Sequence, residues 1–255
     1  SLLGRAGYSF ADKYTVEFNF RYDGSSKFAA ANRWGFFPSG SLGWSLSEES
    51  FLKTYKEKVG DLKIRGSYGL LGNQDIDSYQ YLTSYTPYPN SYGFNNVGVS
   101  GAGFTFGNSN LQWEVTHTLN IGVDATFFNK ALMVSFDYFN KNTKDILITP
   151  EIPSVFGTTL SKTNAGEMTN QGWEVNLGYT LKTGQFYHSF NANVGDSRNK
   201  VLKFVGDEQI TTADNISKIT RVGLPFNSYY GYKINGLFQS MEEIEHHIEK
   251  IEGYP

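Results

Sequence analysis

The chain has 255 residues, of which 16% are aromatic, and its 27 glycines outnumber its 7 prolines, a composition typical of β-strands joined by turns. It contains no cysteine, which excludes disulfides, thiolate metal sites and cysteine nucleophiles, and a net charge of −3 with interspersed charges offers no basic stripe to a nucleic acid. No apolar run approaches the roughly 18 residues that a membrane-spanning helix requires.

A long strand is predicted at residues 14–23, because apolar and polar residues alternate there without interruption. The alternation places Phe18 and Phe20 on one face and Glu17 and Arg21 on the other. One face of this strand is therefore apolar and the other is charged.

Seven further segments show the same alternation, so we expect about eight antiparallel strands in an all-β fold. They lie at residues 4–10, 37–46, 62–70, 113–128, 132–143, 173–181 and 186–198. Short turns at 11–13, 129–131 and 182–185 alternate with long connections at 24–36, 71–112 and 144–171. Residues 47–58 are expected to form a short helix or loop on the short-turn side, and helical spacing predicts a short amphipathic helix over 241–251.

Strands with one apolar and one charged face fit two architectures. In a transmembrane β-barrel, the apolar face meets lipid, the charged face lines a watery lumen, turns are periplasmic and loops are extracellular. In a soluble β-sandwich, the apolar faces form an interior core. The expected lumen-facing residues are Glu17, Arg21, Lys63, Arg65, Glu114, Asp124, Asp137 and Glu174. The expected lipid-facing residues are Phe18, Phe20, Trp44, Ile121, Val123 and Phe136.

An aromatic cluster marks the longest connection as the best candidate for a binding surface. Aromatic rings stack on sugar faces and supply large contact areas at low entropic cost. These side chains are therefore candidates to contact a substrate or a covering partner. Self-packing of a long loop is the more common reason for such a cluster, and the two roles are compatible. They are Tyr79, Tyr81, Tyr85, Tyr88, Tyr92 and Phe94.

No catalytic or metal site is expected. The four histidines are at 117, 188, 246 and 247; the first two are on separate strands, and the adjacent pair cannot share a helix face. No serine hydrolase motif occurs, so the chain is not expected to be an enzyme and no cofactor is implied. The repeated Trp-Glu-Val at 113 and 173 is interpreted as two equivalent strand starts, with Trp at the outer interface and Glu facing inward.

Six blocks of sequence, taken together and in order, resemble the SusC/RagA-type TonB-linked outer-membrane transporters of Bacteroidota. The blocks are "RYDGSSKF" at 21–28, "GFFPSGSLGWSLSEESFL" at 35–52, "LKIRGSYGLLGNQ" at 62–74, "LQWEVTHTLNIGVDATFFNKAL" at 111–132, "NAGEMTNQGWEVNLGY" at 164–179 and "YYGYKINGLFQSMEEI" at 229–244.

The resemblance implies that residues 1–255 are a partial barrel domain of a 22-stranded TonB-dependent receptor, without its plug. The first residues show no export signal, which agrees with an internal piece of a longer protein. The family imports oligosaccharides or peptides, beneath a SusD-like surface lipoprotein and with energy from the TonB complex, which acts through the plug region. The expected function is therefore part of an active importer in the outer membrane; the alternative is a soluble glycan-binding or adhesion module.

Overall fold

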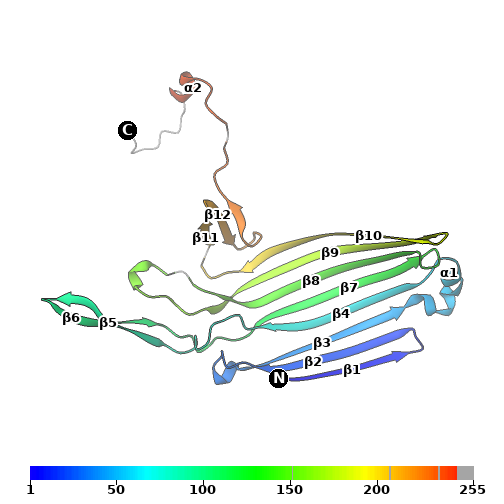
Figure 1. Ribbon diagram of the computed structural model, residues 1–255, viewed down its shortest axis with the longest axis horizontal. Helices are drawn as coiled ribbons and strands as arrows, with labels where there is room; N and C mark the ends of the chain where they lie inside the picture. The colour runs from blue at the N-terminus through cyan, green and yellow to red at the C-terminus, as the bar shows by residue number, and fades with distance from the viewer. Residues whose placement is uncertain (151, 207, 235, 246–255) are drawn as a thin grey trace.

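The computed structural model describes residues 1–150, 152–206, 208–234 and 236–245. Its centre is one antiparallel sheet of eight strands in the order β1-β2-β3-β4-β7-β8-β9-β10, which confirms the predicted strand number. Figure 1 shows the strands lying side by side as a curved wall. Within the described residues, no helix combines the length and the apolar character needed to cross a membrane.

The eight strands of the sheet follow the sequence order. They are β1 Leu2–Phe10, β2 Tyr14–Gly24, β3 Trp34–Ser45, β4 Leu62–Asn73, β7 Glu114–Phe127, β8 Leu132–Ile148, β9 Thr163–Thr183 and β10 Phe186–Lys203. Two small sheets accompany it, a hairpin of β5 Ser84–Phe94 with β6 Val97–Thr105, and a three-stranded sheet of β11 Glu208–Ala213, β12 Ile216–Arg221 and β13 Ser228–Tyr230. The helical elements are η1 Ala30–Asn32, η2 Leu46–Glu48, η3 Ser50–Leu52, α1 Lys53–Lys58, η4 Ser154–Phe156 and α2 Met241–Glu245.

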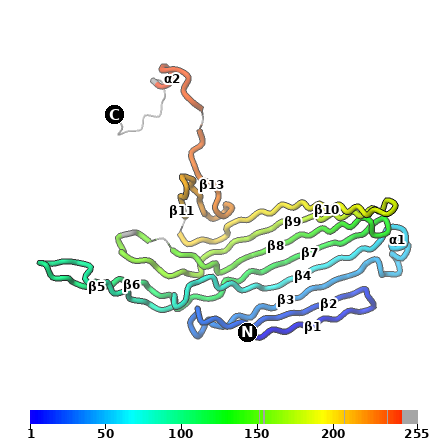
Figure 2. Tube along the Cα trace, in the orientation of Figure 1, coloured from blue at the N-terminus to red at the C-terminus, as the bar shows by residue number. Residues whose placement is uncertain are grey.

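The tight turns β1–β2, β7–β8 and β9–β10 lie at one end of the sheet, hereafter the turn end, together with the helical β3–β4 connection. The β2–β3, β4–β7 and β8–β9 connections lie at the other, the loop end (Figures 1 and 2). The short helix or loop predicted at 47–58 is present as η2, η3 and α1. The predicted helix over 241–251 is present as α2, and its remaining residues lie outside the described part of the chain.

Two long connections differ from their predictions. Half of the connection expected at 144–171 is strand, because β8 extends to Ile148 and β9 begins at Thr163. The alternation is hidden there by a bulge at Asp145, whose φ of 56° shifts the register. The connection expected at 71–112 contains the hairpin β5–β6, which projects beyond the loop end in Figures 1 and 2.

A small apolar core ties the loop end together. Phe28 from the β2–β3 connection and Leu111 from the β4–β7 connection are fully buried, and they pack with Phe37 and Trp113. The Trp113 ring contacts both phenylalanine rings at centroid distances of 5.3 Å. Two loops far apart in the sequence are thereby fixed to the rim of the sheet.

Candidate functional site

The strand register sorts the sheet into a polar face and an apolar face. Paired residues in an antiparallel sheet point to the same side, so the pairings can be followed from strand to strand. The chain of pairs Lys63–Asp124, Asp124–Ser135 and Ser135–Asn176 runs along the polar face. The eight residues predicted to face a lumen all lie on this face. They are Glu17, Arg21, Lys63, Arg65, Glu114, Asp124, Asp137 and Glu174.

Arg65 links three strands on the polar face. Its guanidinium donates to Asp124 on β7 with an Nε–Oδ2 distance of 2.9 Å, and to Asp137 on β8 with an Nη2–Oδ2 distance of 2.6 Å. It passes over Gly122, where a Cβ atom would lie only 2.6 Å from Arg65 Cζ. Ser135 Oγ also donates to Asp124. The missing side chain at Gly122 therefore lets the cation lie between two carboxylates.

The opposite face carries the six residues predicted to face lipid. A single row of pairs crosses it through Tyr14, Trp44, Ile64, Val123, Phe136 and Val175. The other predicted members, Phe18, Phe20 and Ile121, share this face by the same register. Many of these side chains are about half exposed, for example Phe18 at 49% and Ile121 at 47%. No second layer of the described residues covers them as a sandwich core requires.

The apolar face forms a band that runs obliquely across the strands. On β2 the band extends from Tyr14 up to Tyr22, and on β9 from Leu181 up to Trp173. Measured against the rows of paired residues, both edges of the band lie closer to the turn end on β9 than on β2. The row of paired residues connects Tyr14 on β2 with Val175 on β9. Tyr14 lies eight residues below the upper edge of the band on β2, whereas Val175 lies only two residues below the upper edge on β9. The shift of six residues is about 20 Å over about 24 Å of sheet, which gives a tilt of about 40°.

This geometry matches a bilayer. The band spans eight steps along each strand, about 27 Å, which becomes about 21 Å across when the strands are tilted by about 40°. Transmembrane barrels tilt their strands by roughly 35–45° and carry an apolar band about 25 Å tall with aromatic girdles. Stacked rings of Tyr22 and Trp34, at a centroid distance of 5.0 Å, mark the upper edge on β2 and β3.

The lower edge of the band is anchored by Glu49 in the turn between η2 and η3. Its carboxylate accepts hydrogen bonds from Tyr14 Oη at 2.6 Å, Lys13 Nζ at 2.9 Å and Trp44 Nε1 at 3.2 Å. These hydrogen bonds, the one from Tyr14 first, lower the pKa of the Glu49 carboxyl to about 2. Trp44, predicted to face lipid, thus directs its polar N–H toward the turn, as interfacial tryptophans do.

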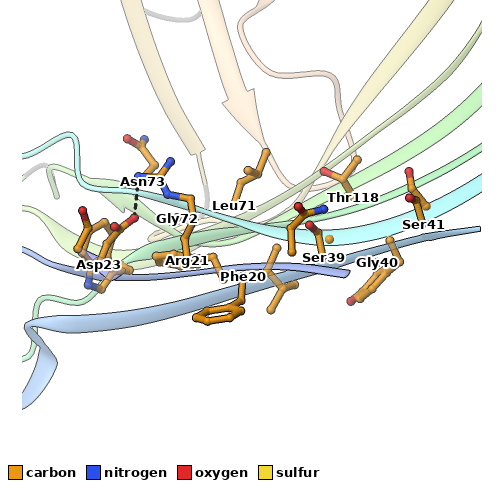
Figure 3. A pocket seen from close by; sticks show the side chains of 18 of the residues that line it. Phe20, Arg21, Asp23, Ser39, Gly40, Ser41, Leu71, Gly72, Asn73 and Thr118 are labelled. Carbon is orange, nitrogen blue, oxygen red and sulfur yellow. Dashed lines mark ion pairs between the residues drawn. The ribbon is translucent and has the colours of Figure 1, made fainter. Parts of the chain in front are cut away.

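A hollow of about 720 Å³ opens on the polar face near the loop end, between β2, β3 and β4 (Figure 3). Arg21 and Asp23 form an ion pair in its wall, with an Nη2–Oδ2 distance of 2.9 Å. Asp23 Oδ1 and Thr118 Oγ1 are buried there without a hydrogen-bond partner among the described residues. Glu17 adds a further carboxylate to the lining. The neutral polar residues of the rim are Asn19, Ser39, Ser41, Ser67, Asn73 and Gln74. The hollow therefore offers hydrogen-bond donors and acceptors beside one ion pair and one further carboxylate.

The hollow lies where β3 and β4 separate. Their pairing ends at Ser39 and Gly69, whereas β2–β3 and β4–β7 pairing continues toward the loops. Pro38 has no N–H to extend the ladder. The unpaired region between β3 and β4, hereafter the seam, is occupied by the ring of Phe37. A Cβ atom on Gly72 would lie 2.0 Å from that ring. No role was predicted for Phe37 from the sequence, because the alternation of β3 places this residue on the polar face among polar neighbours.

The aromatic candidates are divided by the hairpin β5–β6. Tyr88, Tyr92 and Phe94 pair with Gly101, Val99 and Val97 and share one face, and the Tyr88 and Tyr92 rings lie over Gly103 and Gly101. Tyr85 pairs with Phe104 and lies on the other face. Tyr79 and Tyr81 precede the hairpin. Among the six, Tyr85, Tyr88, Tyr92, Phe94 and Tyr79 are more than half exposed.

The Trp-Glu-Val interpretation is wrong in two respects. Trp113 is buried in the small core, with its Nε1 donating to Arg33 O, instead of lying at an outer interface. Trp173 lies inside β9, which begins at Thr163. The residues that pack against Trp113 are far from it in the sequence, so no local sequence pattern predicts these contacts.

The described residues hold no group of three or more His, Asp or Glu side chains placed to bind a metal. His117 contacts Tyr68, with an Nδ1–Oη distance of 2.7 Å, and His188 lies on β10. His246 and His247 fall outside the described residues.

Residues 1–236 match the family model described as TonB dependent receptor-like, beta-barrel. The chain is 34% identical over 248 residues to TonB-dependent receptor P3 of Formosa agariphila, an alignment that covers 94% of this chain and 24% of that protein. It is 33% identical over 254 residues to TonB-dependent receptor SusC of Bacteroides thetaiotaomicron, with 91% and 25% covered.

Among solved structures, the chain resembles the RagAB peptide transporter, with a TM-score of 0.77 and 27% identity over 89% of this chain and 24% of that one. The same assembly in its closed-closed state gives a TM-score of 0.74 at 27% identity, with the same coverage. The chain spans about a quarter of the length of these relatives.

Proposed function

Because the chain belongs to the TonB-dependent receptor-like β-barrel family of outer-membrane proteins, as its resemblance to SusC/RagA-type transporters predicted, we propose that it forms wall and extracellular loops of a nutrient importer. The nutrients are large solutes, oligosaccharides or peptides. The chain is part of a barrel domain, and the plug and its contact with the TonB complex belong to other parts of the protein.

The oblique apolar band carries this proposal. A band about 21 Å across, inclined by about 40° to the hydrogen-bonded rows, is what a bilayer imposes on tilted strands. A soluble sandwich needs no such inclination, because its apolar residues follow the interior between two sheets. The polar face then lines an aqueous lumen, and the Arg65 network is one of its charged features.

In this orientation the turn end is periplasmic and the loop end is extracellular. The hollow beside Arg21 and Asp23 opens in the extracellular half of the lumen, where a polar solute would pass. Import consists of binding at the mouth, closure of a SusD-like lipoprotein and movement of the plug. None of these steps requires covalent chemistry, and the named relatives are receptors and an importer.

The aromatic face of hairpin β5–β6 is the proposed contact surface at the mouth. Tyr88, Tyr92 and Phe94 present adjacent, exposed rings on a hairpin that projects from the sheet. Such rings can stack on sugar rings or fill pockets of the lipoprotein lid.

A growth assay tests the proposal in the native bacterium. Deleting the gene is expected to abolish growth on one class of oligosaccharide or peptide as sole carbon source, and inactivating TonB should give the same loss. Complementation with the double variant Tyr88→Ala/Tyr92→Ala should slow growth at limiting substrate, whereas Tyr85→Ala, on the opposite face of the hairpin, should not. Unchanged growth of the deletion strain on all oligosaccharides and peptides offered would contradict the proposal.

A further inference from the structure

Lys and Arg side chains are sorted between the two faces of the eight-stranded sheet. Those on the polar face are Arg5, Arg21, Lys63, Arg65, Lys141 and Lys182. On the apolar face of the described strands they occur only at the loop ends of β8 and β10. These four residues, hereafter the outer basic patch, are Lys144, Arg198, Lys200 and Lys203. Lys and Arg are thus absent from the apolar band itself.

The patch begins directly above the upper edge of the band. On β9 this edge is Trp173, and Arg198 and Lys200 pair with residues two and four positions beyond it. Those positions are about 7 and 14 Å along the strand, or about 5 and 10 Å in height at a tilt of about 40°. The headgroup layer on each side of a bilayer is roughly 5–8 Å thick. Arg198 therefore lies at headgroup level, and Lys200 lies just above it, within reach of its long side chain.

The charges of the patch are available to a ligand. The Arg198 side chain is 84% exposed and contacts Asp196, with an Nε–Oδ2 distance of 3.2 Å, which leaves its other nitrogens facing solvent. Lys144 and Lys200 are exposed and have no ion-pair partner within the described strands. The acidic residues on this part of the face are Asp196 and Glu167, and Glu167 already accepts from Asn142 Nδ2 at 3.1 Å. The four basic residues outnumber them two to one.

We propose that the outer basic patch binds the phosphate groups of lipid headgroups in the extracellular leaflet. Arg198 offers a fork of N–H donors suited to phosphate oxygens, and the lysines add point charges. The patch spreads over the outside of the wall from the upper edge of the band toward the loop end, and its residues line none of the five best-formed hollows of the described structure, so it fits a lipid surface better than a free anion. It would fix the depth and rotation of the barrel.

Native mass spectrometry of the full-length protein in detergent tests this binding. The probes are lipid A with two phosphates and the same lipid with none, so the acyl chains are matched. The phosphorylated lipid should bind the unaltered protein more tightly. The double variant Arg198→Gln/Lys200→Gln should weaken that binding about 25-fold, because each basic residue near a lipid surface contributes about five-fold.

The double variant Lys63→Gln/Lys141→Gln is the matched control, since it removes the same number of charges from the polar face. It should leave lipid binding unchanged. Heat-modifiable gel mobility checks that each variant is folded. Equal affinity of the unaltered protein for both lipids would overturn the proposal without any variant, and so would equal weakening by the two double variants. Competition by inorganic phosphate at matched ionic strength would assign the patch to a free anion and would also overturn it. None of these outcomes bears on import, which the growth assay measures separately.

Discussion

The assignment of the apolar face to lipid can be tested at Val123. Its position is near the middle of the band, because the band edges on β7 are close to Leu119 and Phe127, each four residues away. Four residues are about 14 Å along the strand and about 11 Å in height. An arginine at this position is therefore near the bilayer midplane.

Val123→Arg is expected to lower the free energy of unfolding by about 2–4 kcal/mol, the range for Arg at the midplane of a transmembrane barrel. Asn120→Arg is the control: it lies on the same strand, on the polar face, and has similar partial exposure. A lumen-facing arginine stays hydrated, so this variant should change stability by no more than about 0.5 kcal/mol.

The assay is equilibrium unfolding of the full-length protein in lipid vesicles with guanidinium, followed by tryptophan fluorescence and heat-modifiable mobility. Equal effects of the two variants would show that both faces meet water. A larger effect of Asn120→Arg would reverse the assignment of the faces. Either result would refute the inference from the oblique band.

Three further outcomes follow from described contacts. Gly122→Val should lower the unfolding free energy by about 1–3 kcal/mol, because a side chain there displaces the guanidinium that crosses β7; Gly66→Ala, whose Cβ atom would meet its nearest neighbour at 3.9 Å, should be tolerated in the same denaturation assay. Because the folded pKa of Glu49 is depressed to about 2, its stabilising effect is present above the ordinary value of 4.5 and lost as pH falls toward 2. Glu49→Gln should remove that part of the acid dependence in a pH titration of stability, and an unchanged titration would contradict the anchoring role. Phe28→Ala should cost the loop core about 3–5 kcal/mol, since the ring is fully buried, and should expose the β2–β3 connection to limited proteolysis before the strands; resistance equal to that of the unaltered protein would count against this core.

Period-two alternation was sufficient to predict the eight strands and the sorting of residues between faces. The register requires only that paired residues share a side, so residues such as Glu17 and Asp137 could be grouped from sequence. Alternation carries no information about what each face meets. That assignment depends on the inclination of the band, which appears only when strands are placed side by side.

Sequence reasoning failed where contacts are long-range or where the period is broken. The bulge at Asp145 hides the last part of β8, and mixed aromatic, Gly and Pro residues hide the hairpin β5–β6. The burial of Trp113 depends on Phe28, more than 80 positions away. Distances of that kind have no local signature.

The seam between β3 and β4 gives this part of the wall an unusual response to temperature. The neighbouring pairs β2–β3 and β4–β7 are held by continuous backbone ladders, whereas beyond Ser39 and Gly69 closure relies on the packed ring of Phe37. Apolar packing weakens on cooling, unlike hydrogen bonding. The seam should therefore loosen in the cold while the neighbouring ladders tighten, which makes it the point in the described wall where chilling first increases amide exchange.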